Sequence, residues 1–360
     1  MKFIALTVGA LVAPCLGLLR FPCAQLVIDR LDPLVSPGEV PSPHLHQIVG
    51  GTSFNATMHP SKDMPAESTC TTCQFSEDFS NYWTAVLYFK ARNGTYKRVP
   101  QIQNVGFDGV EGGMTVYYMQ DGLYNYNQTS KVTAFQPGFR MFIGDVNARS
   151  REQMERYRQV TYTCLQTDIT RDPQILDFPS EPCPEGIMTA LRFPTCWDGK
   201  NLDSPDHMEH MAYPESGTFE TGGPCPDSHP VRMANSSGTV AGSRMLNLDL
   251  VTDMFLCTQF YEVVWDTRSF NNAEDWPEDG SQPFVWSFGD ATGYGNHGDY
   301  VFGWQGDALQ RALDHPCYIN CETLKTQDAA AMNACGIGRT VKEDIDGWTE
   351  TLPGGAVAGM

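Results

Sequence analysis

Residues 82–99, YWTAVLYFKARNGTYKRV, indicate the fold class of this chain. Two runs rich in aromatic and β-branched residues, 82–89 and 95–99, flank the segment 91–94, which reads ARNG. Asn-Gly between two such runs is a strong signal of a β-hairpin, because both residues tolerate the positive φ of the turn. The stretch therefore predicts antiparallel β-structure.

More β-rich segments bounded by glycine or proline follow this hairpin. The charged segment 151–159 is compatible with a short surface helix, and 307–314 predicts a clear helix. At least eight strands with so few helices favour a mainly β protein, an antiparallel β-sandwich or jelly roll, over a parallel α/β sheet. The other predicted strands are 44–49, 114–119, 138–143, 160–164, 186–192, 260–265 and 283–288.

The N-terminus has the pattern of a secretory signal peptide. Lys2 precedes an apolar run that ends near residue 19 and is broken by Pro14. We therefore expect a leader over 1–19, a single β-rich domain over 20–315 and a cysteine-containing C-terminal extension over 316–360. No later segment has the roughly 20 apolar residues of a membrane span. The expected location is extracellular or cell-wall associated, without a membrane partner.

The N-glycosylation sequons and the number of cysteines both indicate an exported protein. The chain has 12 cysteines, and loss of Cys15 with the leader leaves eleven, which we expect to form disulfides. Cys70 and Cys73 resemble a redox motif, but without a βαβ setting a structural role is favoured. Four N-glycosylation sequons, which predict a glycoprotein, begin at Asn55, Asn93, Asn127 and Asn235.

The charge balance excludes one class of partner. A net charge of −19 at pH 7 repels nucleic acid and anionic membrane surfaces. We therefore expect no nucleic-acid partner and a monomeric protein.

Residues 191–210, LRFPTCWDGKNLDSPDHMEH, have an unusual density of functional side chains. Ser204 can cap a helix that begins at Pro205, and this helix would present His207 and His210 on one face. Asp203 would lie at its N-terminal end, so carboxylates and imidazoles could bind a metal, transfer a proton or contact a sugar hydroxyl. The alternative is ordinary turn chemistry, with histidines that cap backbone carbonyls.

Three other segments contain candidate residues. In a strand over 44–49, His44 and His46 would point to one face, a metal or acid/base arrangement that is also common on wet strand faces. His229 lies in the proline-rich turn 223–230. The glycine-rich loop 289–300 contains Asp290, His297 and Asp299, with Tyr294 and Tyr300 as stacking surfaces, although such a loop can also be a long turn.

With these motifs, the sequence resembles a family of secreted fungal proteins known as a domain of unknown function. Members also occur in filamentous bacteria and are sometimes fused to carbohydrate-binding WSC domains. The resemblance covers almost the whole chain after the leader and implies membership and secretion, but no reaction. It rests on residues 30–33, 44–46 with 50–51, 82–83, 112–118, 191–203, 207 with 210, 225–232 and 289–299.

One departure from the family pattern is an insertion over residues 234–258. It contains the sequon at Asn235 and the extra Cys257. Without it ten cysteines remain, an even number compatible with five disulfides, so Cys257 is expected to be free or dispensable. The segment is interpreted as a lineage-specific loop or an error in the gene model.

Three classes of function remain open. The leading hypothesis is a hydrolase or lyase on a cell-wall or plant polysaccharide, which needs paired carboxylates or a base with a cation beside the sugar carboxylate. A lectin-like glycan-binding protein is the second, and a secreted metal-binding protein with six histidines, 44, 46, 207, 210, 229 and 297, is the third. We expect no cofactor, with a divalent metal as the open alternative.

The catalytic hypothesis assigns named roles. If one site exists, His46, Asp203, His207, His229 and His297 should converge in one cleft. The expected catalytic set is His46, Asp203, His207, His229, Asp290, His297 and Asp299. The expected substrate-binding set is Arg30, His44, Arg192, Trp197 and Tyr294.

Overall fold

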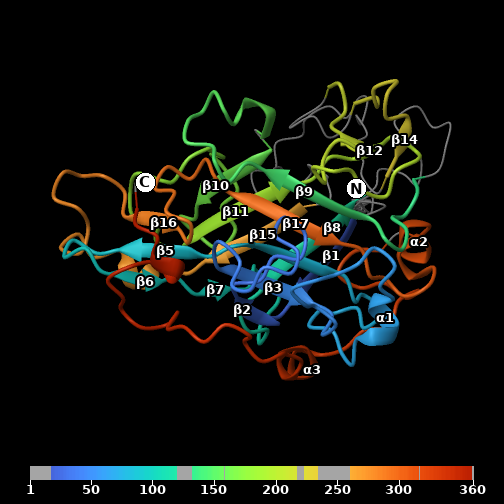
Figure 1. The fold of residues 1–360 in the computed structure, drawn as a ribbon, viewed down its shortest axis with the longest axis horizontal. Coiled ribbons are helices and arrows are strands. Elements are labelled where there is room, and N and C mark those ends of the chain that lie inside the picture. The colour runs from blue at the N-terminus through green and yellow to red at the C-terminus, as the bar shows by residue number, and fades with distance from the viewer. Residues whose placement is uncertain are drawn as a thin grey trace, which may run out of the picture.

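In this computed structural model, the antiparallel strands of two large sheets form the centre of the fold, and long loops surround them (Figure 1). The structure describes residues 18–119, 132–157, 159–216, 223–233, 260–315 and 317–358. The predicted leader up to residue 17, the whole insertion 234–258 and the sequons at Asn127 and Asn235 lie outside these residues. Leu18 and Leu19, which the predicted leader includes, begin the first strand.

The first large sheet has six strands. Its order is β1-β8-β15-β11-β10, and β7 pairs with β15 beyond the end of β8. All of these pairs are antiparallel. The strands are β1 (Leu18–Cys23), β7 (Gln101–Ile102), β8 (Met114–Met119), β10 (Val160–Cys164), β11 (Ile187–Arg192) and β15 (Phe260–Trp265).

The second large sheet has five strands in the order β2-β3-β4-β17-β9 and is also antiparallel. Strand β3 begins at His46, so the predicted strand over 44–49 starts two residues too early and His44 precedes it. The strands are β2 (Val27–Asp29), β3 (His46–Gly50), β4 (Asn81–Ala85), β9 (Arg140–Gly144) and β17 (His297–Val301).

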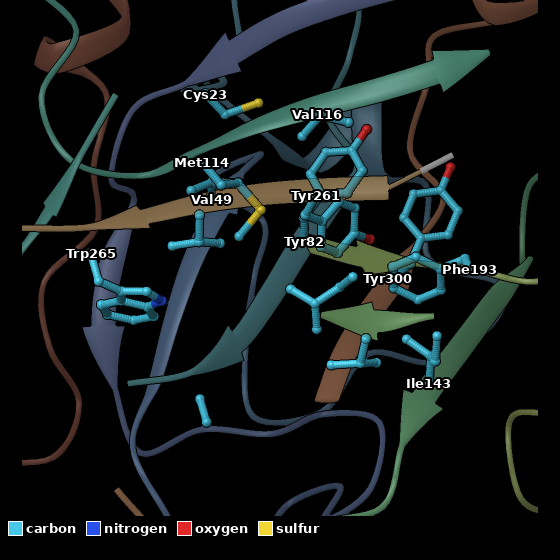
Figure 2. Close-up of a cluster of buried hydrophobic side chains, with 14 of the residues drawn as sticks. Cys23, Val49, Tyr82, Met114, Val116, Ile143, Phe193, Tyr261, Trp265 and Tyr300 are labelled. Atoms are coloured by element: carbon cyan, nitrogen blue, oxygen red, sulfur yellow. The ribbon is translucent and has the colours of Figure 1, made fainter. Parts of the chain in front are cut away.

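The two large sheets pack face to face through a core of aromatic side chains (Figure 2). Tyr82 of β4 and Tyr261 of β15 have ring centroids 5.3 Å apart. The Tyr82 hydroxyl lies 2.8 Å from that of Tyr118 on β8, which donates to the Tyr300 hydroxyl on β17 at 2.9 Å. Because buried hydroxyls need partners, this chain of tyrosines satisfies its polar atoms while filling the core. The predicted β-sandwich is confirmed.

Two small sheets and a few short helices complete the fold. The predicted hairpin is confirmed as β5 and β6, and Gly94 in its turn has φ +89°. The predicted surface helix over 151–159 is only a 3-10 turn, Glu155–Tyr157. The small sheets contain β16 (Phe284–Trp286), β5 (Leu87–Lys90) and β6 (Tyr96–Arg98), and β13 (Met211–Ala212), β12 (Cys196–Trp197) and β14 (Val231–Arg232); the helices are α1 (Met64–Glu67), α2 (Ala308–Leu313), α3 (Ala329–Ala334) and the 3-10 turns Arg268–Phe270 and Pro353–Gly355.

Five disulfides connect the ten cysteines that remain when Cys15 and Cys257 are set aside; both of these lie outside the described residues. Cys70 and Cys73 bond to different partners, so their structural role is confirmed. Cys70–Cys335 and the backbone bridge between Tyr96 and Thr349 attach the C-terminal extension to the sandwich. The pairs are Cys23–Cys73, Cys70–Cys335, Cys164–Cys183, Cys196–Cys225 and Cys317–Cys321.

Strand alternation separates the two faces of the five-stranded sheet. Val49, Tyr82 and Tyr300 point into the core between the sheets, whereas Ile48 and Trp83, their neighbours along the strands, pack on the opposite face. Leucine, phenylalanine and methionine side chains from residues 31–64 cover that outer face. This covered outer face holds the cluster described next. No helix of the described residues is long and apolar enough to cross a membrane.

Candidate metal centre

Three buried histidines meet on the outer face of the five-stranded sheet. His44 Nε2 lies 3.2 Å from His297 Nε2, and His297 Nε2 lies 3.4 Å from His46 Nε2. One ring nitrogen from each residue lies within 4.8 Å of the other two. The exposed fractions are 6 % for His44, 0 % for His46 and 1 % for His297. Three imidazole nitrogens so close together form a potential metal site.

Strand pairing brings two of these histidines together although 251 residues separate them. His46 is the first residue of β3 and pairs with Ala85 of β4. His297 is the first residue of β17, which pairs along the other edge of β4 from Gly298 onward. The third ring, His44, lies 4.2 Å from the ring of His46 and 5.0 Å from that of Phe288.

The glycine-rich loop before β17 orients His297. The buried Asp290 carboxylate accepts hydrogen bonds from the backbone of Gly293 at 3.1 Å and of Gly295 at 2.8 Å. The Gly295 carbonyl in turn faces His297 Nδ1 at 3.3 Å. Asp290 therefore shapes the loop that supplies a partner to the imidazole, and it does not contact the three-histidine cluster through any hydrogen bond of the described residues.

Backbone carbonyls fix the tautomers of two imidazoles. His46 Nδ1 lies 3.0 Å from the Leu31 carbonyl, and His297 Nδ1 faces Gly295 as described. A carbonyl oxygen only accepts hydrogen bonds, so the ring hydrogen of each neutral imidazole is on Nδ1 and each Nε2 carries a lone pair. Histidines that bind metals commonly have this arrangement, with the far nitrogen donating to a backbone carbonyl.

Burial keeps all three imidazoles neutral. Desolvation lowers the pKa of His46 to about 3. It also lowers the pKa of His297 to about 3, with a smaller contribution from the electrostatic interaction with His46. The pKa of His44 falls well below its usual value through burial, His46, His297 and Arg30. Neutral imidazole is the form that binds metal ions, so the lone pairs are available at physiological pH.

Two buried carboxylates lie beside the histidines. Asp299 Oδ2 is 3.9 Å from His297 Nε2, and the negative charge of Asp32 acts on His297 and Asp299. Burial raises the pKa of both carboxyl groups, and Asp32 further raises that of Asp299. Asp32 is not among the site residues predicted from the sequence, where its only signal is its place in the motif Arg30-Leu-Asp-Pro.

The segment 203–210 is a series of turns, so the predicted helix from Pro205 is wrong. The Asp206 carboxylate accepts from the backbone of Met208 and Glu209, and His207 has φ +58°, a left-handed conformation that a helix excludes. His207 and His210 therefore do not share a helical face.

The expected single site is divided between separate places. His207 Nδ1 lies 2.6 Å from Asp203 Oδ1, while His210 lies between Ser204 Oγ at 2.9 Å and the Arg140 carbonyl at 2.8 Å. His229 bonds the Glu209 carbonyl at 2.9 Å. No hydrogen bond or ion pair among the described residues joins these side chains to the three-histidine cluster. Their catalytic roles remain predictions.

The expected substrate-binding residues are also dispersed. Arg192 is buried and donates to Thr161 and Gln174, and burial lowers its pKa to about 10. Trp197, 9 % exposed, donates to the Asn201 carbonyl within a small sheet, and Tyr294 is half-buried in the loop before β17. Of this set, His44 belongs to the three-histidine cluster, and the charge of Arg30 acts on His44.

Fold and site together define a disulfide-linked β-sandwich protein with a buried cluster of three histidines. The comparison with protein families identifies its family. The family described as "Domain of unknown function (DUF1996)" matches residues 32–240 and 252–304, and the chain belongs to this family. The unmatched residues 241–251 lie within the predicted insertion. No curated protein and no solved structure matches the chain.

Proposed function

We propose that this protein binds a divalent transition-metal ion through Nε2 of His44, His46 and His297. One observation carries the proposal: His46 Nε2 and His297 Nε2 face each other at 3.4 Å while both Nδ1 atoms face carbonyl oxygens. Neither Nε2 of a neutral ring can then donate to the other, and two opposed lone pairs repel. A cation between them removes the repulsion, and burial disfavours a proton there.

The distances between the nitrogens support a shared ion. Two ligands that each bind at about 2.0–2.1 Å with a tetrahedral angle are about 3.3–3.4 Å apart. The nitrogen pairs that include His297 are 3.2 and 3.4 Å apart. Imidazole ligands suit zinc, copper, iron and nickel, so the ion belongs to this group.

Metal uptake by the chelated protein tests this proposal. We expect one equivalent of Co²⁺ or Zn²⁺ to bind to the wild type, measured by dialysis and elemental analysis. His46→Ala should lose the ion, since one of three ligands is absent. His229→Ala, which changes a histidine outside the cluster, should retain it. A wild type without an equivalent of metal, or equal uptake by wild type and His46→Ala, would contradict the proposal.

We also infer that the protein is exported and glycosylated. The five disulfides fit an oxidising compartment, and the leader pattern and the exposed sequon residues Asn55 and Asn93 support the same inference. Mass spectrometry of protein from the culture medium tests both points. The inference predicts a mature N-terminus near residue 20 and glycans removable by an endoglycosidase; an intact leader would contradict it.

A second candidate function is metal-dependent cleavage of an acidic cell-wall or plant polysaccharide. Arg30 favours this candidate function, because its positive charge acts on His44, the most exposed of the three histidines, where a substrate would approach the ion. A lyase needs a cation to neutralise the sugar carboxylate, and three protein ligands leave a coordination position on a catalytic ion. The Glu343 carboxylate lies 3.5 Å from Arg30 Nε and would compete with a substrate carboxylate for this cation.

Product release from a polysaccharide panel tests the catalytic candidate. We expect reducing ends or unsaturated sugars from an acidic glycan with the metal-loaded protein, and none after chelation or with His46→Ala. Cleavage that continues in chelated protein would show a metal-free site, and glycan binding without products would leave the lectin-like function.

A further inference from the structure

Asp299 is a fully buried carboxylate whose two oxygens have no hydrogen-bond partner among the described residues. It follows His297 by two positions in β17, so both side chains point to the outer face of the sheet. Trp83 and Phe142 lie directly opposite Asp299 on the two neighbouring strands. Aromatic neighbours do not solvate a carboxylate, and a buried unpaired charge costs several kcal/mol.

The groups nearest to Asp299 cannot neutralise it. His297 Nε2, 3.9 Å from Asp299 Oδ2, carries a lone pair because its ring hydrogen faces Gly295. Asp32 adds a second negative charge, and one of its oxygens already accepts from the backbone of Leu34 and Val35. Without a cation, burial favours the protonated form of both carboxyl groups. When both are ionised, the three neutral imidazoles and two carboxylates have a net charge of −2, which one divalent ion balances.

From this arrangement we propose that Asp299 is the fourth ligand of the ion held by His44, His46 and His297. The inference rests on the proposed metal binding and adds the class of the ion. A carboxylate oxygen favours hard or borderline divalent ions such as Zn²⁺, Co²⁺ or Mn²⁺, whereas Cu⁺ prefers soft ligands. Asp299 thus selects a divalent ion over Cu⁺, and Asp32 contributes charge without direct contact.

Asp299 lies at the side of His297 but outside the group of three ring nitrogens that lie within 4.8 Å of one another. The Asp299 oxygen is 3.9 Å from His297 Nε2, compared with about 3.3–3.4 Å for neighbouring ligands of a tetrahedral ion. A rotation of the Asp299 side chain toward the histidines is needed to bring its oxygen to the same ion. An ion that accepts five or six ligands would keep positions open for water or substrate beside this set.

Co²⁺ binding to three proteins tests the inference: wild type, Asp299→Asn and Asp32→Asn. Visible absorption reports the ligands of Co²⁺, and competition with a chelator gives the affinity. We expect Asp299→Asn to weaken Co²⁺ binding by more than about 100-fold and to change the spectrum, because a direct ligand of the ion is altered. Asp32→Asn should weaken binding by about 10-fold and leave the spectrum unchanged, because only a nearby charge is lost.

Binding of Cu⁺ gives a second readout. The Cu⁺ affinity of Asp299→Asn should stay within about threefold of the wild-type value, while its Zn²⁺ affinity falls below that of the wild type. The preference for Zn²⁺ over Cu⁺ should therefore decrease. Asp78→Asn serves as the control, because Asp78 is an equally buried carboxylate with partners of its own, including Tyr82 Oη at 2.7 Å. It should bind both ions as the wild type does.

The stability of the metal-free protein shows whether Asp299→Asn folds. Removal of an unpaired buried charge should leave the melting temperature of the chelated variant equal to or above that of the wild type, while the increase on adding Zn²⁺ should be lost. Wild-type protein that binds no Co²⁺ would refute both the metal centre and this inference. Normal wild-type binding with unchanged affinity and spectrum in Asp299→Asn would refute only the inference.

Discussion

His46 and His297 hold their Nε2 atoms 3.4 Å apart, and each turns its Nδ1 toward a backbone carbonyl, Leu31 for His46 and Gly295 for His297. The carbonyls leave the opposed nitrogens without hydrogen atoms, so the pair is suited to a cation rather than to a mutual hydrogen bond. The arrangement depends on backbone groups, which side-chain substitution leaves in place. Its consequences can therefore be tested one side chain at a time.

The first prediction concerns stabilisation by metal. Zn²⁺ at about 100 times its dissociation constant should stabilise the wild type by about 2.7 kcal/mol, because it binds only the folded protein. His297→Ala should show none of this stabilisation, whereas His207→Ala, outside the three-histidine cluster, should show all of it. Chemical unfolding with and without Zn²⁺ measures the difference. Equal stabilisation of His297→Ala would contradict the assignment.

The second prediction concerns Asp290, which accepts from the backbone of Gly293 and Gly295. Asp290→Ala should loosen the loop that orients His297 and lower Zn²⁺ affinity by roughly 10-fold, as other supporting residues of metal ligands do. Asp203→Ala removes a carboxylate that pairs with His207 and should leave Zn²⁺ affinity unchanged. Chelator competition compares the two, and equal affinities would show that Asp290 does not position the histidine.

The third prediction concerns pH. Burial raises the pKa of Asp78 to about 7, compared with about 3.9 in an unfolded chain. The folded protein therefore binds more protons than the unfolded chain between these values, so this group makes stability fall as pH rises from about 4 to 7. The loss is on the order of a few kcal/mol.

Asp78→Asn should remove that part of the pH dependence, because the amide does not ionise. Urea unfolding of chelated protein across this pH range measures it, with chelation excluding any effect of the metal. The Tyr82 hydroxyl can reverse its hydrogen bond to accommodate the amide, since it also lies 2.8 Å from the Tyr118 hydroxyl. Parallel stability curves for wild type and variant would refute the prediction.

The fourth prediction concerns Gly50 at the end of β3. It has φ +109°, and a Cβ atom there would lie 1.8 Å from the Ser80 carbonyl oxygen. Gly50→Ala should destabilise the protein by on the order of 3 kcal/mol through strain and overlap. Gly94→Ala, at φ +89° with open space around it, should cost only about 1 kcal/mol. A similar loss of stability in both variants would show that the close approach of the Ser80 carbonyl to Gly50 does not cause the destabilisation.

The predicted fold was largely recoverable from local patterns. The hairpin around Asn93 and Gly94, the strand over 260–265 and the helix near 308–313 depend on turn chemistry, side-chain alternation and helical spacing of apolar residues, which act over a few residues. Segment 203–210 was mispredicted for the same reason: Asp206 can satisfy backbone groups in a turn as well as at a helix start, and only the surrounding contacts choose between them.

The sequence by itself determined that this chain is a β-rich protein with paired cysteines, and it marked His44, His46, His297 and Asp299 as unusual. It could not determine which of its polar clusters belong together, because such proximity depends on the order of strands in the sheets. Only the tertiary structure decided that β3 and β17 flank β4, which brings His46 and His297 into contact and leaves Asp203 and His207 elsewhere. Burial under residues 31–64 then keeps the imidazoles neutral and leaves Asp299 without a hydrogen-bond partner among the described residues, an environment that no local pattern encodes.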